Sequence, residues 1–139
     1  MMPDEKHVMR SLGLLFEQAH ALVLSDPALD LRPSQLRVLG MVPASGVTVS
    51  HLADLVGMTK QGIGQFVTQL VQSGYLTTEV SREDRRVRMV HRTDRGEEAC
   101  HELALVMKDL ENRWAKQIGV RRYRQFRIVL DEIASRSDD

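Results

Sequence analysis

One segment of this 139-residue chain, residues 81–95, is rich in arginine. Residues 81–95 hold six arginines against three acidic residues, a net charge of +3, whereas the whole chain has a formal net charge of zero. A local cluster of guanidinium groups is suited to contacts with phosphate oxygens. The arginines are Arg82, Arg85, Arg86, Arg88, Arg92 and Arg95. We therefore expect this segment, and not the chain as a whole, to contact nucleic acid.

A second group of polar residues precedes this segment, on a predicted helix that Thr59 can cap and that runs to about Ser73. Its apolar residues share one face and are Ile63, Phe66, Val67, Leu70 and Val71. On the other side, in the first turns, are Thr59, Lys60, Gln61 and Gln65. Gln can pair with adenine through two hydrogen bonds and Lys can donate to guanine, so these side chains suit base readout. The alternative interpretation is a solvated polar face.

The elements around these two groups are predicted to be two short helices followed by a β-hairpin. Thr48 can cap a short helix that Gly57 ends, and the helix after Thr59 follows at once, which makes a helix-turn-helix. After Gly74, residues 75–80 and 87–92 are predicted strands around a polar loop. A hairpin with a charged tip directly after the second helix is a wing. The predicted fold class is mainly α with a small β-hairpin wing.

Both ends of the chain carry apolar residues at heptad spacing, which is typical of helices that meet other helices. They are Val8, Leu12, Leu15, Ala19 and Leu22; Ala99, Leu103, Val106 and Leu110; and Tyr123, Phe126, Leu130 and Ile133. We expect a homodimer that buries them and sets two recognition helices roughly 34 Å apart. The alternative is the core of a monomeric bundle. The expected organisation is a single domain, residues 1–139, with dimerisation helices in 1–30 and 97–139 and a DNA-binding winged helix-turn-helix lobe in 31–96.

Five segments carry a family resemblance when they are taken in order. They are residues 31–39, 48–53, 58–61, 70–76 and 84–96. The last is the most specific, because an Asp-x-Arg tip is followed by an alternating strand and then by Thr-x-x-Gly. Together they resemble the multiple-antibiotic-resistance regulator (MarR) family of winged-helix repressors. The resemblance implies obligate homodimers that bind pseudo-palindromic operators in double-stranded DNA, usually repress, and release DNA when a small ligand or oxidant binds.

The resemblance also assigns roles in the wing. Arg86 matches the family arginine that reaches into the minor groove, and Asp84 matches the acid that holds it. The arginines assigned to phosphates are Arg82, Arg85 and Arg88. A solubilising turn is the alternative interpretation of these arginines.

Three hydroxyl residues begin helices and either donate to phosphate or simply cap those helices. They are Ser34, Thr48 and Ser50. The chain departs from the family at Arg92, where Leu is common before Thr93, and at Arg32, where Ser or Thr is usual. Gly62 and Gly64 lie in the recognition helix, and each costs about 1 kcal/mol relative to Ala. The helix is therefore soft before DNA arrives, or its backbone approaches DNA closely.

An effector pocket between the dimerisation helices and the DNA-binding lobe is a further implication of the resemblance. Its walls are expected to come from Leu12, Leu15, Phe16, Val38, Met41 and Val106. Such an apolar cleft suits a lipophilic or phenolic molecule, and ordinary core packing is the alternative. We expect a ligand there to shift the protein away from the DNA-binding state.

Catalysis finds no support among the motifs of this sequence. The motifs G-x-S-x-G, C-x-x-C and H-E-x-x-H and a phosphate-binding loop are missing, so we expect neither an enzyme nor a cofactor. No two of the five histidines stand at i, i+4 spacing, so we expect no metal site. The single cysteine, Cys100, is expected to be a small buried residue and not a redox switch.

The start of the sequence lacks the basic flank and apolar stretch of a secretory signal, and no run approaches the roughly 20 apolar residues of a membrane span. We therefore expect a cytoplasmic protein with no membrane partner. The alternative function is a winged-helix protein-interaction module without specific DNA binding. The salt dependence of binding distinguishes the two functions, because binding through phosphates weakens steeply as the salt concentration rises.

Overall fold

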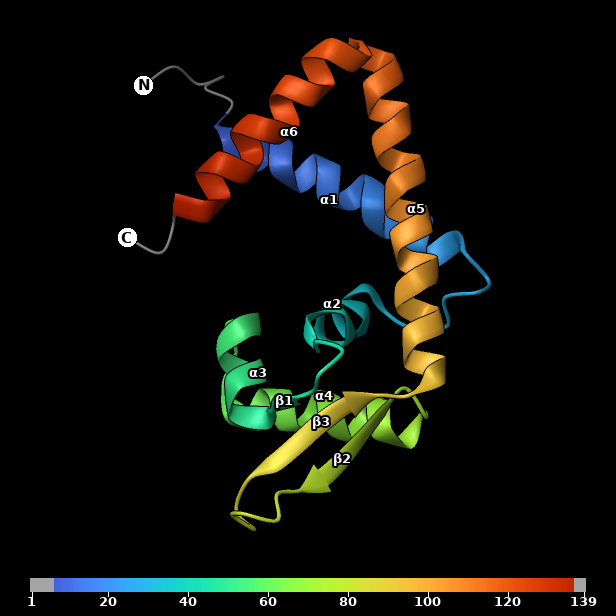
Figure 1. The fold of residues 1–139 in the computed structure, drawn as a ribbon. Helices are drawn as coiled ribbons and strands as arrows, with labels where there is room; N and C mark the ends of the chain where they lie inside the picture. The colour runs from blue at the N-terminus through green and yellow to red at the C-terminus, as the bar shows by residue number, and fades with distance from the viewer. Residues whose placement is uncertain (1–6, 137–139) are drawn as a thin grey trace. The chain divides into compact units, whose positions relative to one another are not determined.

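The computed structural model describes residues 7–136, whose helices and strands are labelled in Figure 1. In chain order they are α1 (Val8–Ser25), α2 (Pro33–Met41), β1 (Val47–Thr48), α3 (Val49–Val56), α4 (Lys60–Gln72), β2 (Leu76–Val80), β3 (Arg88–Arg92), α5 (Asp94–Ile118) and α6 (Val120–Ser135). This mainly helical chain with one small hairpin confirms the predicted fold class. Two compact units divide the described chain, residues 7–104 and residues 105–136, and α5 begins in the first and ends in the second.

Side-chain caps set the starts of the helices in the first unit. The Thr48 hydroxyl oxygen accepts a hydrogen bond from the backbone N–H of His51 at 3.1 Å, and Thr59 accepts from Gly62 at 3.1 Å. At α2, where Arg32 replaces the usual hydroxyl residue, the Gln35 side chain instead accepts from the Arg32 N–H at 3.0 Å. These caps satisfy N–H groups that have no partner inside their own helices.

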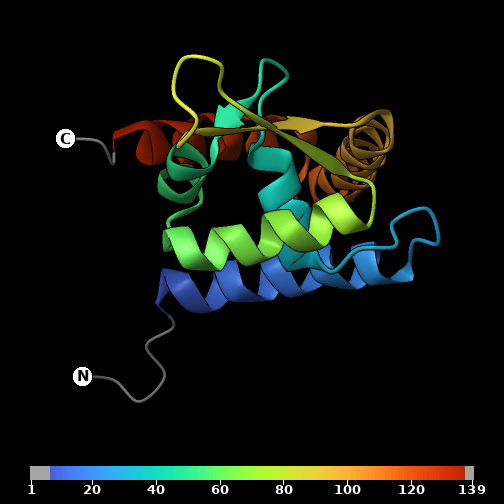
Figure 2. The same cartoon turned by 90° about the horizontal axis from the view of Figure 1, so that it is seen from below.

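The helix-turn-helix is formed by α3 and α4, which the short turn 57–59 joins. Gly57 ends α3 with φ of 76°, a left-handed conformation that glycine adopts without strain. Seen from below in Figure 2, α4 crosses in front of α2, and the two helices are in contact. Both helices of the predicted motif are therefore present.

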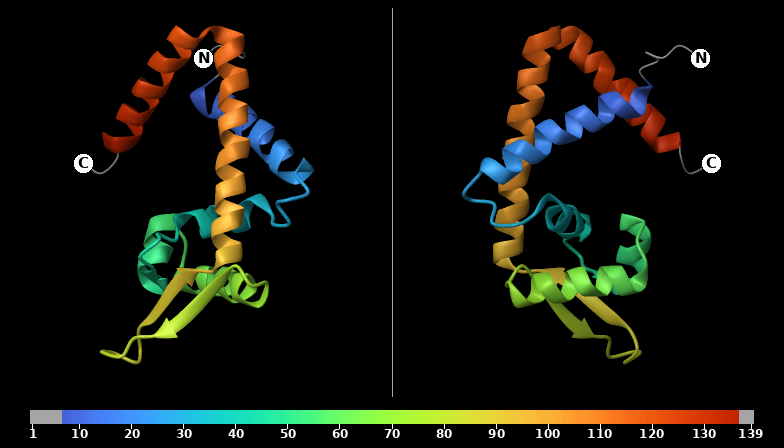
Figure 3. Two further views of the ribbon diagram at one scale, coloured as in Figure 1. Left: turned by 45° about the vertical axis from the view of Figure 1, so that its right-hand side comes forward. Right: turned by 180° about the vertical axis from the view of Figure 1, so that it is seen from behind.

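The wing is part of a three-stranded antiparallel sheet with the order β1-β3-β2. Thr78 on β2 faces Val90 on β3, and Val90 also faces Val47 on β1. The loop between β2 and β3 projects away from α2, α3 and α4 in both views of Figure 3. The hairpin was predicted, but β1 was not, because two residues carry too little pattern to indicate a strand.

The core of the first unit lies between α2, α3, α4 and the sheet. Its fully buried side chains include Leu36, Leu39, Leu52, Ile63, Leu70, Leu76 and Val90. On the predicted apolar face of α4, Ile63, Val67 and Leu70 are buried and Phe66 is half-buried. The prediction was wrong for Val71, which is exposed because it lies one residue beyond Leu70, at the edge of that face.

The base of the hairpin and the start of α5 share one hydroxyl group. The Thr93 hydroxyl donates to the carbonyl oxygen of Gly74 at 2.6 Å and accepts from the N–H of Gly96 at 3.1 Å. The Thr93 N–H also donates to the carbonyl oxygen of Tyr75 at 3.1 Å. A Cβ at Gly96 would lie 2.2 Å from that same oxygen, so only glycine permits this approach.

The second unit is a helical hairpin formed by the end of α5 and by α6. Gly119 joins them with φ of 93°, a conformation that favours glycine. The Tyr123 hydroxyl donates to the Glu111 carboxylate at 2.5 Å, and Arg127 also pairs with Glu111. These contacts hold the pKa of Glu111 below its ordinary value. In residues 7–136 no helix is long and apolar enough to cross a membrane.

Candidate nucleic-acid interface

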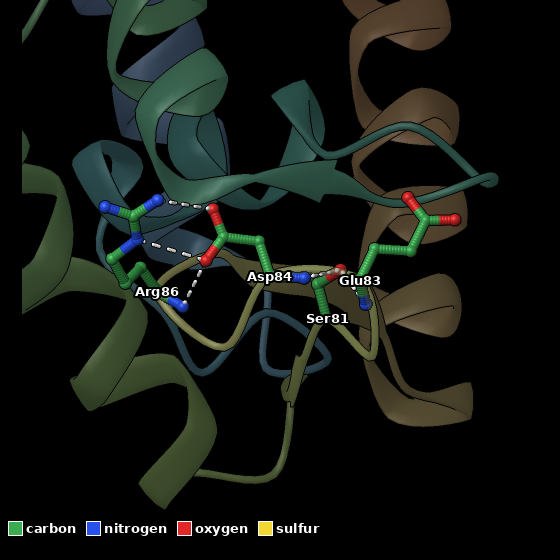
Figure 4. Close-up of polar contacts among 4 residues, drawn as sticks. All are labelled: Ser81, Glu83, Asp84 and Arg86. Atoms are coloured by element: carbon green, nitrogen blue, oxygen red, sulfur yellow. Dashed lines mark hydrogen bonds and ion pairs between the residues drawn. The ribbon is translucent and has the colours of Figure 1, made fainter.

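Asp84 holds the Arg86 side chain in a fixed direction at the tip of the wing (Figure 4). One carboxylate oxygen of Asp84 accepts from the Arg86 backbone N–H at 3.0 Å and from its Nε at 3.2 Å, and the other accepts from Nη2 at 3.3 Å. The Arg86 side chain is nevertheless 91% exposed. The pairing with Arg86 lowers the pKa of Asp84. The tip therefore presents an oriented guanidinium group to an outside partner.

Ser81 organises the rest of the tip. Its hydroxyl oxygen accepts from the N–H groups of Glu83 at 3.2 Å and of Asp84 at 3.4 Å, as Figure 4 shows. The Ser81 N–H donates to the carbonyl oxygen of Val87 at 2.9 Å, and this closes the loop. Sequence reasoning missed Ser81. Its signal is a Ser placed two and three residues before the N–H groups that it can accept, which is a common turn motif.

The six arginines of the basic segment separate into two groups. Arg82, Arg85, Arg86 and Arg88 are exposed on the wing. Arg92 is turned inward instead, since it donates to the carbonyl oxygens of Leu39 at 3.2 Å and Gly40 at 2.9 Å and pairs with Glu97 at 3.5 Å.

Arg95 also contacts other residues of the protein. It donates to the carbonyl oxygen of Ser73 at 2.5 Å, and its guanidinium lies 4.4 Å from the centre of the Tyr75 ring. Hence the arginines that remain available to a phosphate are those of the wing, and the charge count over residues 81–95 overstates the free charge.

The exposed side of α4 carries Lys60, Gln61 and Gln65, whose side chains are accessible. Thr59 is exposed too, but its hydroxyl oxygen already caps the helix. An open groove of about 470 Å³ runs between this side of α4 and β3, and we call it the helix–wing groove. It is lined by Gln61, Gly64, Gln65, Thr68, Gln69 and Arg88. Sequence reasoning did not single out Thr68 or Gln69, because the position of Arg88 beside this side of α4 is a tertiary feature.

The three hydroxyl residues at helix starts have different surroundings. Thr48 caps α3, as its alternative interpretation proposed. Ser34 and Ser50 lie exposed in the first turns of α2 and α3. Their contact with phosphate stays a prediction.

The residues predicted to line an effector pocket differ widely in burial. Val38 is 1% exposed and belongs to the core, whereas Phe16 is 63% exposed and Met41 is 38% exposed. Leu12 and Leu15 are half-buried on α1, and Val106 is half-buried in the second unit. The pocket stays a prediction.

The remaining candidates for chemistry are the possible metal ligands and the single cysteine. Among residues 7–136, no three His, Cys, Asp or Glu side chains are grouped so that they could hold a metal ion. Cys100 is half-buried, and this burial raises the pKa of its thiol, which Arg92 partly opposes. A thiol with a raised pKa carries little thiolate near neutral pH, and the thiolate is the reactive form.

Comparison with known proteins agrees with this geometry. Residues 29–87 match the model of the MarR family. The regulator PetP of Rhodobacter capsulatus, described as an HTH-type transcriptional regulator, is 29% identical over 86 residues. That match covers 62% of this chain and 52% of PetP, so the chain spans about half the length of this relative.

Two solved structures share the fold over nearly the full chain. A crystal structure of MarR has a TM-score of 0.83 at 20% identity, and the match covers 97% of this chain and 93% of that one. The transcriptional repressor CouR, solved bound to a 23-mer DNA duplex, has a TM-score of 0.77 at 22% identity, with 91% and 89% covered.

Proposed function

We propose that this protein, whose residues 29–87 match the model of the MarR family, is a transcriptional regulator of that family that binds specific sequences in duplex DNA as a homodimer. It acts on a pseudo-palindromic operator, as a repressor that a small ligand releases.

The observation that carries the proposal is the oriented Arg86 at the tip of the wing. A narrow minor groove concentrates negative potential, and an arginine that enters it loses side-chain freedom. The two hydrogen bonds that Asp84 accepts from the Arg86 guanidinium restrict that freedom in advance. Because the carboxylate oxygens of Asp84 accept from Nε and Nη2, the Nη1 group of Arg86 remains available to DNA. A side chain that is 91% exposed yet held in one direction is suited to insertion into a groove.

The recognition helix supplies the second contact. The start of α4 enters the major groove, where Lys60, Gln61 and Gln65 face base edges. Their exposure supports this role, because these side chains are available to the bases. Arg82, Arg85 and Arg88 contact phosphates on either side of the wing. The repressor CouR, which shares this fold, was solved on a DNA duplex and lends support by analogy.

A second copy of the chain covers the apolar side chains that α1 and α6 expose. On α1 these are Val8, Met9, Leu14, Phe16 and Leu24; on α6 they are Val120, Ile128, Val129, Leu130 and Ile133. Exposed apolar surface of this extent is typical of an interface. A two-fold dimer presents two copies of α4 and of the wing, and so requires two half-sites in the operator.

The effector is a lipophilic or phenolic molecule that contacts Leu12, Leu15, Phe16 and Met41, which are the predicted pocket residues of the first unit other than the buried Val38. Apolar side chains that are only partly buried on α1 and α2 support this part of the proposal. A ligand that binds the DNA-free state more tightly shifts the population toward that state.

The test is selection of bound sequences from randomised duplex DNA, with the mass of the free protein measured alongside. We expect a dimer that enriches an inverted repeat with half-site centres about one helical turn apart. A monomer that retains no duplex at low ionic strength would refute the proposal and favour a protein-interaction module.

A further inference from the structure

The two glycines of the recognition helix have different local surroundings. A Cβ at Gly62 would lie 3.1 Å from Met58 Cε and 3.2 Å from Thr59 Oγ1, so a side chain there would require these neighbours to shift by a few tenths of an ångström. A Cβ at Gly64 would meet no atom of the described residues within 4 Å, and its φ is not positive. Neither packing nor backbone strain inside the protein therefore accounts for glycine at position 64.

Gly64 is one of the residues that line the helix–wing groove. A side chain at this position would project into the groove, because no protein atom stands in its way. Glycine in a helix interior weakens the helix relative to alanine. A residue that weakens the helix and keeps a groove open is expected where something outside the protein fills that groove.

The walls of the helix–wing groove offer hydrogen-bond donors and no carboxylate. Gln61, Gln65 and Gln69 stand four residues apart along α4, and their side chains form no hydrogen bond with another described residue. On the opposite wall, Arg88 donates from Nη2 to the Thr78 hydroxyl oxygen at 3.4 Å. No carboxylate within the described part of the chain pairs with Arg88, so its charge is available.

Thr68 also lines the groove but offers no hydrogen-bond donor to it. Its hydroxyl donates to the carbonyl oxygen of Gly64 at 2.9 Å, which uses its only proton inside the helix. The lining of the groove therefore combines amide groups of α4 with the guanidinium of Arg88 and contains no carboxylate. This arrangement is suited to a chain of phosphodiesters, because phosphate oxygens can accept hydrogen bonds from Gln69 and Arg88 while Gln61 and Gln65 face the bases.

We propose that the helix–wing groove holds one sugar-phosphate strand of duplex DNA, with Arg88 and Gln69 on its phosphates, and that residue 64 is glycine so that this strand can approach α4. The inference rests on the proposed function. When α4 lies in the major groove and Arg86 in the adjacent minor groove, the strand that separates the two grooves passes between α4 and β3. That is the position of the helix–wing groove.

The first experiment compares Gly64→Ala and Gly64→Leu with the wild type on a duplex recovered by selection. Gly64→Ala is expected to raise the melting temperature by about 2 to 5 °C, because alanine stabilises a helix interior. The same variant is expected to weaken DNA binding by about tenfold, and Gly64→Leu by more, because each side chain obstructs the strand. Stability and affinity then change in opposite directions, which a merely structural role for Gly64 does not produce.

Gly40→Ala is the matched control. Gly40 lies in α2, and a Cβ there also meets nothing within 4 Å. This variant is expected to gain thermal stability while its DNA affinity stays within about twofold of the wild type.

The second experiment measures the salt dependence of Arg88→Gln on the same duplex. Loss of one phosphate contact lowers the slope of log K against log salt by about 0.9. Lys108→Gln, which removes an exposed charge from the second unit, is expected to leave the slope unchanged.

The outcomes separate the inference from the function on which it rests. A wild-type protein that binds no duplex refutes both. A wild type that binds, with Gly64→Leu equally tight or with an unchanged slope for Arg88→Gln, overturns the strand assignment and leaves the regulator intact.

Discussion

At the scale of single residues, Asp84 and Arg86 define the wing tip. The Arg86 guanidinium is exposed, so it contributes little to folding and is available for binding. Arg86→Ala is expected to weaken binding to the selected duplex by about tenfold or more while the protein stays folded. A fluorescence-anisotropy titration measures the affinity, and circular dichroism checks the fold. Unchanged affinity would remove the wing from the interface.

The carboxyl group of Asp84 gives a pH prediction that needs no DNA. Its pKa lies below the ordinary value of 3.8 because Arg86 stabilises the carboxylate. The pairing is therefore fully present above the ordinary value of 3.8, and is lost only as the pH falls through the lowered pKa. A carbon-detected NMR titration of Asp84 is expected to give a midpoint below 3.8. In Arg86→Ala the midpoint should return toward that value, and an identical midpoint in both proteins would contradict the pairing.

At the scale of elements, Arg92 ties the end of β3 to the end of α2. It donates to the carbonyl oxygens of Leu39 and Gly40, which lie near the end of α2. Arg92→Leu, which restores the residue common in the family, is expected to lower the free energy of unfolding by about 1 to 3 kcal/mol, because both carbonyls lose their charged donor. Urea denaturation measures this change. Arg82→Leu, on the exposed wing, is the control, and an equal loss in both variants would mean that Arg92 has no special role.

The same elements show which features the sequence alone predicts and which it does not. Thr48, Gly57 and Thr59 are local signals, and the structure has helix ends where they predict them. The contacts that Arg92 and Arg95 make within the protein could not be predicted, because the carbonyl groups that they contact lie 52 or 53 residues and 22 residues away along the chain. For the same reason β1 was missed, since its partner residues Met89 and Val90 belong to a distant strand.

At the scale of the whole molecule, the exposed apolar face of α6 predicts how the protein assembles. Ile133 is 66% exposed, and a charged group there would have to be desolvated in a dimer. Ile133→Glu is expected to weaken dimerisation by about tenfold or more. Sedimentation equilibrium measures this change, with Gln125→Glu, an exposed polar position of the same helix, as the control. A dimer that tolerates Ile133→Glu as well as the control would exclude α6 from the interface.

The heptad pattern predicted the terminal helices but not the division of the chain. Residues 7–104 form one unit, so α1 groups with the helix-turn-helix, and the unit boundary falls inside α5. A helix that continues through a boundary leaves no compositional signal there, since its residues keep the same periodicity on both sides. The functional division into dimerisation helices and DNA-binding lobe stays a prediction.

The direct passage from β3 into α5 has a mechanical consequence. Only Thr93 separates Arg92, the last residue of the strand, from Asp94, the first of the helix, and its hydroxyl is bonded on both sides. Because this connection is short and hydrogen-bonded, we expect the first turn of α5 and the base of the hairpin to move together. A rotation of that turn is then expected to displace the tip of the wing.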